Sequence, residues 1–158
     1  MEQEKKGKMG QSVKAMVFHG GKLLLLQKND GRRRHHWEFP GGGLEQDEDF
    51  IAALWREVHE ETGLAVAVLA PVGIWHYCCG GSCLNGVIFA AAAETAAVRL
   101  SHEHLQYAWV GPQELGGYRL HGSLCRSLRQ MRAFAGAGGW RQVQPFLQAF
   151  GEVRYDGE

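Results

Sequence analysis

The sequence lacks an excess of charge of either sign, and it lacks any long apolar segment. Its 158 residues include 17 acidic and 17 basic side chains, so the formal net charge is zero. A neutral chain has no overall attraction for nucleic acid polymers or for anionic membranes. The apolar run over residues 23–26 is far shorter than the roughly 20 residues of a membrane-spanning helix. The composition therefore predicts neither a nucleic acid polymer nor a membrane as a partner.

The amino-terminal segment lacks the apolar stretch of a secretory signal, because MEQEKKGKMGQ is mostly charged and polar. We expect residues 1–11 to be a disordered lead and residues 12–158 to form a single domain. A domain of this size buries a substantial core. Without a signal for export, the protein is expected in the cytoplasm, and a homodimer is possible.

Cysteine is scarce, and no regular Cys/His spacing accompanies it. The four cysteines are Cys78, Cys79, Cys83 and Cys125. In a cytoplasmic protein they are expected as reduced thiols. Cys79 and Cys83, with His76 nearby, could imitate a zinc site, but no second evenly spaced pair completes it. We therefore interpret these cysteines as metal-free residues of a loop or strand.

Short apolar runs between turn residues predict strands, and apolar residues at helical spacing predict helices. The predicted strands cover residues 12–18, 23–27, a segment before a break at Pro71-Val72-Gly73, 73–77, 83–93 and 106–110. The predicted helices cover residues 48–62 with Asp47 as N-cap, a short helix opening at 111–115, and 122–134. This mixture predicts an α/β or α+β domain. After Trp140, apolar residues indicate a packed tail or a partner contact, namely Phe146, Leu147 and Phe150.

The most informative stretch is GGLEQDEDFIAALWREVHEETGL, residues 42–64. On a helix, Glu57, Glu60 and Glu61 share one face, because residues three and four apart are neighbours. A neighbouring stripe is apolar and would pack against a sheet; it comprises Ile51, Leu54 and Val58. Crowded carboxylates repel one another unless hard cations such as Mg²⁺ or Mn²⁺ lie among their oxygens. The pattern therefore predicts a metal-dependent phosphate site.

The residues around this acidic face fit the same interpretation. Arg56 lies four positions before Glu60, so it can pair with a carboxylate and hold it in place. The loop Pro40-Gly41-Gly42-Gly43 can approach a ligand closely and expose carbonyl oxygens. Gly63 follows as the left-handed residue that ends a helix.

This stretch resembles the box of the Nudix (MutT-like) hydrolases: a glycine, five residues, a glutamate, seven residues, then Arg-Glu-apolar-x-Glu-Glu-x-Gly-apolar. Every fixed position is filled, by Gly42, Glu48, Arg56, Glu57, Val58, Glu60, Glu61, Gly63 and Leu64. A solvated acidic helix would explain the glutamates but neither the glycines nor the arginine in register with them. The resemblance implies an α/β/α sandwich with a mixed sheet, and hydrolysis of a diphosphate linkage.

The resemblance also implies a role for each residue of the box. Glu60, Glu61 and the Gly42 carbonyl would hold Mg²⁺ or Mn²⁺. Glu57 would bind a further ion or position the attacking water, and Arg56 would orient the glutamates. Glu48 would make a contact at the start of the helix. The catalytic candidates are thus Glu57, Glu60 and Arg56.

A second stretch, Ser101-His102-Glu103-His104, precedes the last predicted strand. It resembles a segment of several Nudix families, notably the asymmetric diadenosine tetraphosphate hydrolases, in which a loop glutamate joins the metal. By resemblance Glu103 is that ligand; otherwise it is an exposed loop acid. Those hydrolases usually carry a Pro-Lys-Gly-His-like approach to the box, whereas this chain has Pro40-Gly41-Gly42-Gly43.

Candidate substrate contacts lie before the box and after it. Residues 32–36 form a basic loop, which is either a solvated tip or a phosphate contact through arginines such as Arg34. Aromatic rings could stack on a base; the candidates are Trp37, Phe39, Trp75 and Tyr77.

The expected function is hydrolysis of a nucleoside diphosphate derivative, as in nucleoside triphosphate or nucleotide-sugar pyrophosphatases. Trp37-Glu38-Phe39-Pro40-Gly41-Gly42 favours this small-molecule nucleotide substrate by resemblance. The alternatives are a dinucleoside polyphosphate hydrolase and a nucleotide-binding module without catalysis. Such modules usually lose box glutamates, and this chain keeps all of them.

Overall fold

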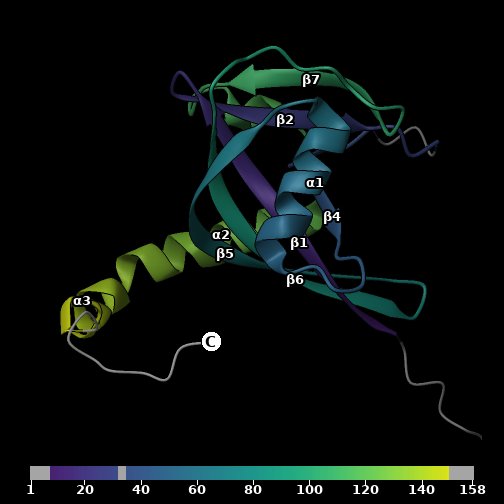
Figure 1. Cartoon of the computed structure of the whole chain (residues 1–158). Coiled ribbons are helices and arrows are strands. Elements are labelled where there is room, and N and C mark those ends of the chain that lie inside the picture. Colours follow the sequence, from purple (N-terminus) through teal and green to yellow (C-terminus); the bar gives the residue numbers. More distant parts are fainter. Residues whose placement is uncertain (1–7, 32–34, 150–158) are drawn as a thin grey trace, which may run out of the picture.

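The computed structural model describes residues 8–31 and 35–149, and a seven-stranded mixed sheet lies at its centre (Figure 1). The strands are β1 Met9–His19, β2 Lys22–Lys28, β3 Trp37–Glu38, β4 Gly41–Gly43, β5 Val66–Cys79, β6 Ser82–Ala93 and β7 His104–Val110. The main strand order is β3-β2-β1-β6-β5, while β4 pairs with β1 and β7 pairs with β2. β1 and β6 are parallel, and the other pairings are antiparallel.

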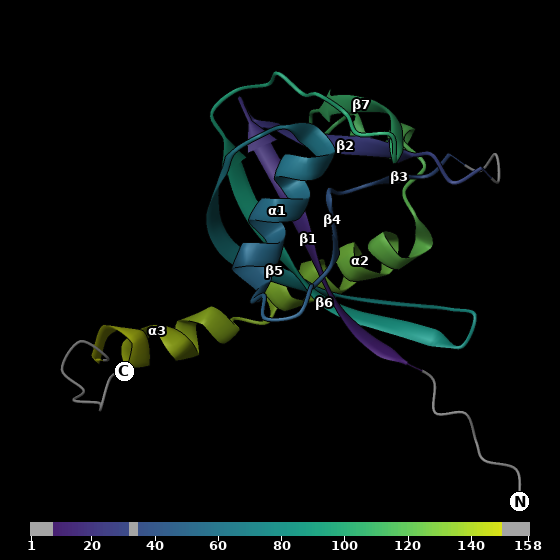
Figure 2. The ribbon, with the colours of Figure 1, turned by 45° about the vertical axis from the view of Figure 1, so that its right-hand side comes forward.

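Helices cover both faces of the sheet (Figures 1 and 2). The covering helices are α1 Phe50–Thr62 and α2 Gly122–Gly136. The structure also has α3 Gly139–Ala149 and a short 3₁₀ helix at Leu115–Gly117. Leu24 and Leu26 of β2 lie in one core with side chains of α1, whereas Leu23 and Leu25 lie in the opposite core with side chains of α2. Because β2 is buried on both faces, its apolar run is continuous. The predicted α/β/α arrangement with a mixed sheet is confirmed.

Helix α1 begins later than predicted. Its N-cap is Asp49, whose Oδ1 accepts a hydrogen bond of 2.7 Å from the Ala52 backbone N–H. Asp47 instead has a φ of 67°, in the left-handed region, so its prediction as N-cap is wrong. The helix ends as predicted, because Gly63 has a φ of 70° and donates its N–H to the His59 carbonyl.

Strand β5 is continuous, so the predicted break at Pro71-Val72-Gly73 is wrong. The pairing with β6 instead shifts register between Val68 and Ala70 and again between Pro71 and Gly73. β5 lies at one end of the strand order, and an edge strand tolerates a proline at a bulge. The short helix expected at 111–115 lies at Leu115–Gly117, after a turn over the preceding residues.

The prediction that all four cysteines are reduced thiols is wrong, because two of them pair in the hairpin that joins β5 to β6. Gly80 and Gly81 both have positive φ and form a two-residue turn, which sets Cys78 directly opposite Cys83. These two cysteines form a disulfide, whereas Cys79 and Cys125 are free. The turn therefore places two sulfurs side by side that the sequence separates by five positions.

The two ends of the described chain differ from the expectations. β1 begins at Met9, so residues 9–11 belong to the sheet rather than to a disordered lead, and residues 1–7 lie outside the described residues. Helix α3 projects away from the sheet (Figure 2), and Trp140 and Phe146 are exposed on it. The described part of α3 is therefore not a packed tail, and Phe150 lies outside the described residues. Among the helices that the structure describes, none has the length and apolarity to cross a membrane.

Candidate metal centre

Strand β4 brings a glycine backbone against the carboxylate-bearing helix. Gly41 has a φ of 149°, and a Cβ there would lie 2.1 Å from the Val13 carbonyl oxygen. A Cβ on Gly42 would lie 2.5 Å from Oε1 of Glu57. Gly41 therefore requires glycine, because the β1 backbone closes on it, and a side chain on Gly42 would displace the Glu57 carboxylate.

Arg56 ties the start of α1 to the glutamates that follow it. Its guanidinium donates to both carboxylate oxygens of Glu48, at 2.8 and 2.7 Å, and to the Gly43 carbonyl at 3.1 Å. It also donates to Oε1 of Glu57 at 3.0 Å. The bond to Arg56 is the main reason that the pKa of Glu48 falls to about 2. A single planar guanidinium thus contacts two carboxylates and the glycine strand, and the role of Arg56 in orienting the glutamates stays a prediction.

Glu61 is the most deeply buried carboxylate of the site, with 4% of its surface exposed. Burial raises its pKa to about 8, although Lys14 and the Gly41 N–H, which donates to Glu61 Oε2 at 3.0 Å, oppose that rise. Burial also raises the pKa of Glu57, and Arg56 opposes the change. Both carboxyl groups therefore resist ionisation in the absence of a cation.

Glu103 comes from a different part of the chain and reaches the same cleft. The cleft has a volume of about 1060 Å³, and Glu57, Glu61, Glu103 and the strand β4 line it. The charge of Glu103 contributes to the raised pKa of Glu57. The Glu103 carbonyl accepts the Asn29 N–H at 2.9 Å, which anchors its loop to the end of β2. Carboxylates from a helix and from a loop thus face one space, as a multidentate oxygen site requires.

Glu60 lies apart from this group. Its side chain is 57% exposed, and its Oε2 accepts a hydrogen bond of 3.4 Å from Arg56. The described cleft lining includes Glu57 and Glu61 but not Glu60. A metal-binding or catalytic role for Glu60 stays a prediction.

All four aromatic candidates belong to or pack against the core beside α2, where Trp75 is 9% exposed, and two of them also line the cleft. Trp75 and Tyr77 line the cleft and stack on each other, with centroids 6.0 Å apart. Phe39 is fully buried, so the prediction that it stacks on a base is wrong. Trp37 packs edge-on against Tyr118 in the core beside α2, so the structure does not bring it to the cleft. Arg34 lies outside the described residues.

Sequence reasoning missed an ionic network of largely buried side chains in the wall of the cleft. Lys14 is 6% exposed, and its Nζ lies 3.5 Å from Oε2 of Glu38. The buried His104 places Nε2 2.9 Å from the other Glu38 oxygen. Burial opposes ionisation of Glu38, but Lys14 and His104 outweigh it and hold the pKa of Glu38 at about 2. The sequence did contain one indication of this network, because Lys14 lies among apolar residues in the predicted strand and a buried lysine needs a counter-charge.

The donor set fits a hard divalent cation. The cleft is lined by the carboxylate residues Glu57, Glu61 and Glu103 beside the glycine strand β4. Ser12 also lines it, is 1% exposed, and its Oγ has no hydrogen-bond partner in the part of the chain that the structure describes. Oxygen ligands of this kind suit Mg²⁺, and a bound cation would offset the cost of burying the ionised Glu57 and Glu61, which is the main reason that both pKa values are raised.

The fold and the site together define an α+β protein whose carboxylate-lined cleft suits a divalent cation. A family model for the NUDIX domain matches residues 8–130. The CTP pyrophosphohydrolase of Escherichia coli K12 is 31% identical over 114 residues, which cover 72% of this chain and 84% of that protein. The chain therefore belongs to the Nudix family of hydrolases.

Other similarities agree on the family but differ in extent. An RNA pyrophosphohydrolase of Bartonella tribocorum is 37% identical over 62 residues, or 39% of this chain, and the match spans 36% of that protein's length. The crystal structure of a MutT protein from Methanosarcina mazei Go1 superposes with a TM-score of 0.73 at 26% identity, covering 83% of this chain and 98% of that one.

Proposed function

We propose that the protein hydrolyses a diphosphate linkage in a nucleoside diphosphate derivative and that Mg²⁺ is required. The observation that carries the proposal is the convergence of Glu57, Glu61 and Glu103 on one cleft beside the glycine strand β4. Phosphate groups repel an attacking water, so catalysis depends on neutralising charge and on positioning. A cleft of buried carboxylates serves that purpose when it holds divalent cations.

The proposed ligands that line the cleft are Glu57, Glu61, Glu103 and the carbonyl of Gly42. Glu60, which is exposed and outside the described lining, is proposed as a ligand from the family resemblance alone. When bound, Mg²⁺ would neutralise phosphate charge and lower the pKa of a coordinated water. Arg56 fixes the neighbouring carboxylates and ties the glycine strand to them through its hydrogen bond to the Gly43 carbonyl.

Glu57 would then position the attacking water or accept its proton. Burial raises the pKa of Glu57 toward neutral pH, and a carboxylate with a higher pKa is a stronger general base. The stacked pair Trp75 and Tyr77 offers an aromatic surface on the wall of the same cleft, suited to a nucleobase. Substrate would thus lie with its phosphates at the glutamates and its base toward β5.

The names of two relatives support a substrate with a phosphoric anhydride bond on a nucleotide. The names CTP pyrophosphohydrolase and RNA pyrophosphohydrolase both describe cleavage of a phosphoric anhydride attached to a nucleotide. The neutral chain favours a small nucleotide over an RNA polymer. A dinucleoside polyphosphate is the second candidate substrate. The Ser101-His102-Glu103-His104 segment resembles that of the asymmetric diadenosine tetraphosphate hydrolases, and Glu103 lines the cleft.

The test is product analysis with the purified full-length chain and Mg²⁺. The panel contains nucleoside triphosphates, nucleotide sugars, a dinucleoside tetraphosphate and an RNA oligonucleotide with a 5′-triphosphate. We expect cleavage of an anhydride bond in a mononucleotide derivative at the highest kcat/KM. Tight nucleotide binding without cleavage in Mg²⁺ or Mn²⁺ would overturn the proposal in favour of a binding module.

A further inference from the structure

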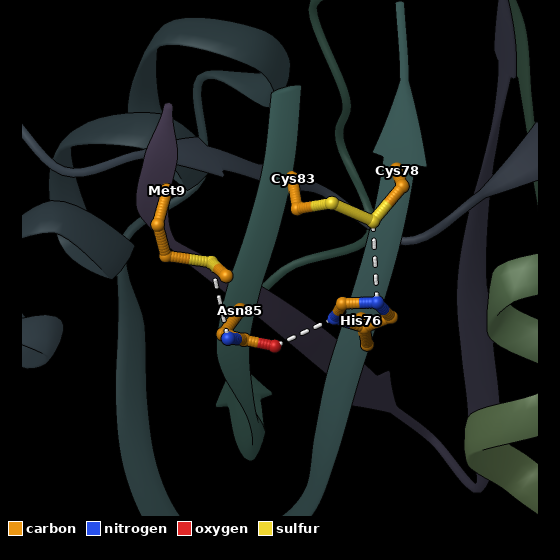
Figure 3. The surroundings of a disulfide bond; sticks show 5 residues. All are labelled: Met9, His76, Cys78, Cys83 and Asn85. Carbon is orange, nitrogen blue, oxygen red and sulfur yellow. Dashed lines mark hydrogen bonds between the residues drawn. A yellow bond between two sulfur atoms is a disulfide. The ribbon is translucent and has the colours of Figure 1, made fainter. Parts of the chain in front are cut away.

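The hairpin of β5 and β6 carries a second cluster of donor atoms, on the side of the strand away from the nucleotide cleft. Side chains alternate along a strand, so His76 and Cys78 share one face of β5 while Tyr77 and Cys79 share the other. Tyr77 and Cys79 line the cleft. His76, Cys78 and Cys83 place one ligand atom each within 4.8 Å of one another (Figure 3).

Hydrogen bonds orient the imidazole of His76 as a ligand. Asn85 lies opposite His76 in the register, and its Nδ2 donates to the thioether sulfur of Met9 at 3.2 Å. The Asn85 Oδ1 therefore faces His76, 2.7 Å from Nδ1 (Figure 3). An amide oxygen only accepts, so in the neutral imidazole Nδ1 carries the hydrogen. The lone pair is then on Nε2, which lies 3.3 Å from Sγ of Cys78.

We propose that the reduced hairpin binds one thiophilic divalent ion of the zinc class through His76 Nε2 and the thiolates of Cys78 and Cys83. The disulfide is the oxidised, metal-free state of the same site. This assignment goes beyond the proposed hydrolase activity and does not depend on it. It also differs from the sequence-based grouping, since Cys78 rather than Cys79 faces His76.

The chemistry balances with an external dithiol as reductant. The dithiol gives two electrons and two protons to the Cys78–Cys83 bond, and its own sulfurs become a disulfide. Binding of a divalent ion then releases both thiol protons to solvent. Tetrahedral zinc has Zn–S and Zn–N bonds of about 2.3 and 2.0 Å, which puts ligand atoms about 3.8 Å or less apart. In the oxidised hairpin the three ligand atoms lie within 4.8 Å of one another and the two sulfurs are bonded, so reduction must let the sulfurs separate to the spacing of a tetrahedral site. The exposed positions of His76 and Cys78 leave a fourth vertex for water.

The softness of the donors separates this site from the carboxylate cleft. Sulfur and imidazole ligands select zinc-class ions, whereas the oxygen ligands of the cleft select Mg²⁺. A metal-binding histidine usually donates the N–H of its other ring nitrogen to an oxygen, and His76 has such a hydrogen-bond partner. Asn85 provides that oxygen here.

The test uses Co²⁺ as a spectroscopic probe. The full-length chain is reduced with a phosphine, kept free of oxygen, supplied with excess Mg²⁺ to fill the carboxylate cleft, and titrated with Co²⁺. We expect a thiolate-to-cobalt charge-transfer band that saturates at one equivalent and disappears when Zn²⁺ is added. Carboxylate-bound Co²⁺ has no such band, so the failure of this proposal and the failure of the hydrolase proposal are distinguishable.

Variants identify the ligands. Cys78→Ser and Cys83→Ser should lose the band, while Cys79→Ser, on the opposite face, should keep it as a matched control. Asn85→Ala should weaken Co²⁺ binding about 10- to 100-fold, and Asn85→Asp should retain it, because a carboxylate also accepts the Nδ1 hydrogen. Absence of the band in the reduced chain, unchanged affinity in Cys83→Ser, or loss of the band in Cys79→Ser would overturn the assignment.

Discussion

Replacing Glu61 by glutamine should stabilise the metal-free protein at alkaline pH while slowing turnover at least about a hundredfold. The pKa of Glu61 rises to about 8 on folding from a usual 4.5, chiefly because the carboxyl is buried. The stability of the metal-free wild type that depends on this group is fully present below pH 4.5 and is lost as pH rises through about 8. A difference of this size corresponds to about 5 kcal/mol at most. Glutamine resembles the protonated acid and can still accept the Gly41 N–H, so the variant avoids the loss.

The measurement is urea unfolding in excess chelator, at about pH 5 and about pH 8.5. Glu61→Gln should lie within about 1 kcal/mol of the wild type at the lower pH and exceed it by several kcal/mol at the higher pH. Glu60→Gln, on an exposed position of the same helix, is the matched control and should stay within about 0.5 kcal/mol of the wild type at both. Added Mg²⁺ should stabilise the wild type but not Glu61→Gln. A Glu61→Gln variant less stable than the wild type at pH 8.5 would refute the reasoning.

Three further substitutions test other parts of the account. Glu103→Ala should raise the Mg²⁺ concentration for half-maximal rate and lower kcat, yet leave the Tm of the metal-free protein nearly unaltered. If the variant keeps the wild-type dependence on Mg²⁺, Glu103 is an exposed loop acid and not a metal ligand. Glu38→Gln should cost about 3 kcal/mol in urea unfolding at neutral pH, because it leaves Lys14 buried without its counter-charge; an unchanged midpoint would contradict this. Arg56→Lys should lower kcat about tenfold or more without unfolding the protein, since an ammonium cannot bridge Glu48 as a planar guanidinium does, and a wild-type rate would argue against that role.

The elements near the box were predictable because their determinants are local. Helical spacing places Glu57 and Glu61 on one face, and a glycine stop ends the helix at residue 63. The exact helix start was not predictable from a cluster of acids, since Asp47 and Asp49 are both good N-caps. Backbone conformation decides between them, and only Asp49 has the extended geometry of a cap.

The contacts between distant segments required the structure. Lys14 and Glu38 lie on different strands, and nothing in the local pattern gives the pairing that joins them. Phe39 and Trp75 are both aromatic residues near the box, but Phe39 points into the core and Trp75 lines the cleft. The Cys78–Cys83 bond did have a local signal, because a two-glycine turn fixes the register of its hairpin.

The measurement that tests the central claim most directly is turnover of the best nucleotide substrate in chelator, then after Mg²⁺ is restored, for the wild type and Glu61→Gln. The account predicts that wild-type turnover vanishes in chelator and returns with Mg²⁺. It also predicts that Glu61→Gln stays at least about a hundredfold slower at every Mg²⁺ concentration, because a buried metal-binding charge supplies several kcal/mol to the transition state. Full turnover in excess chelator, or a near-normal rate for Glu61→Gln, would contradict it.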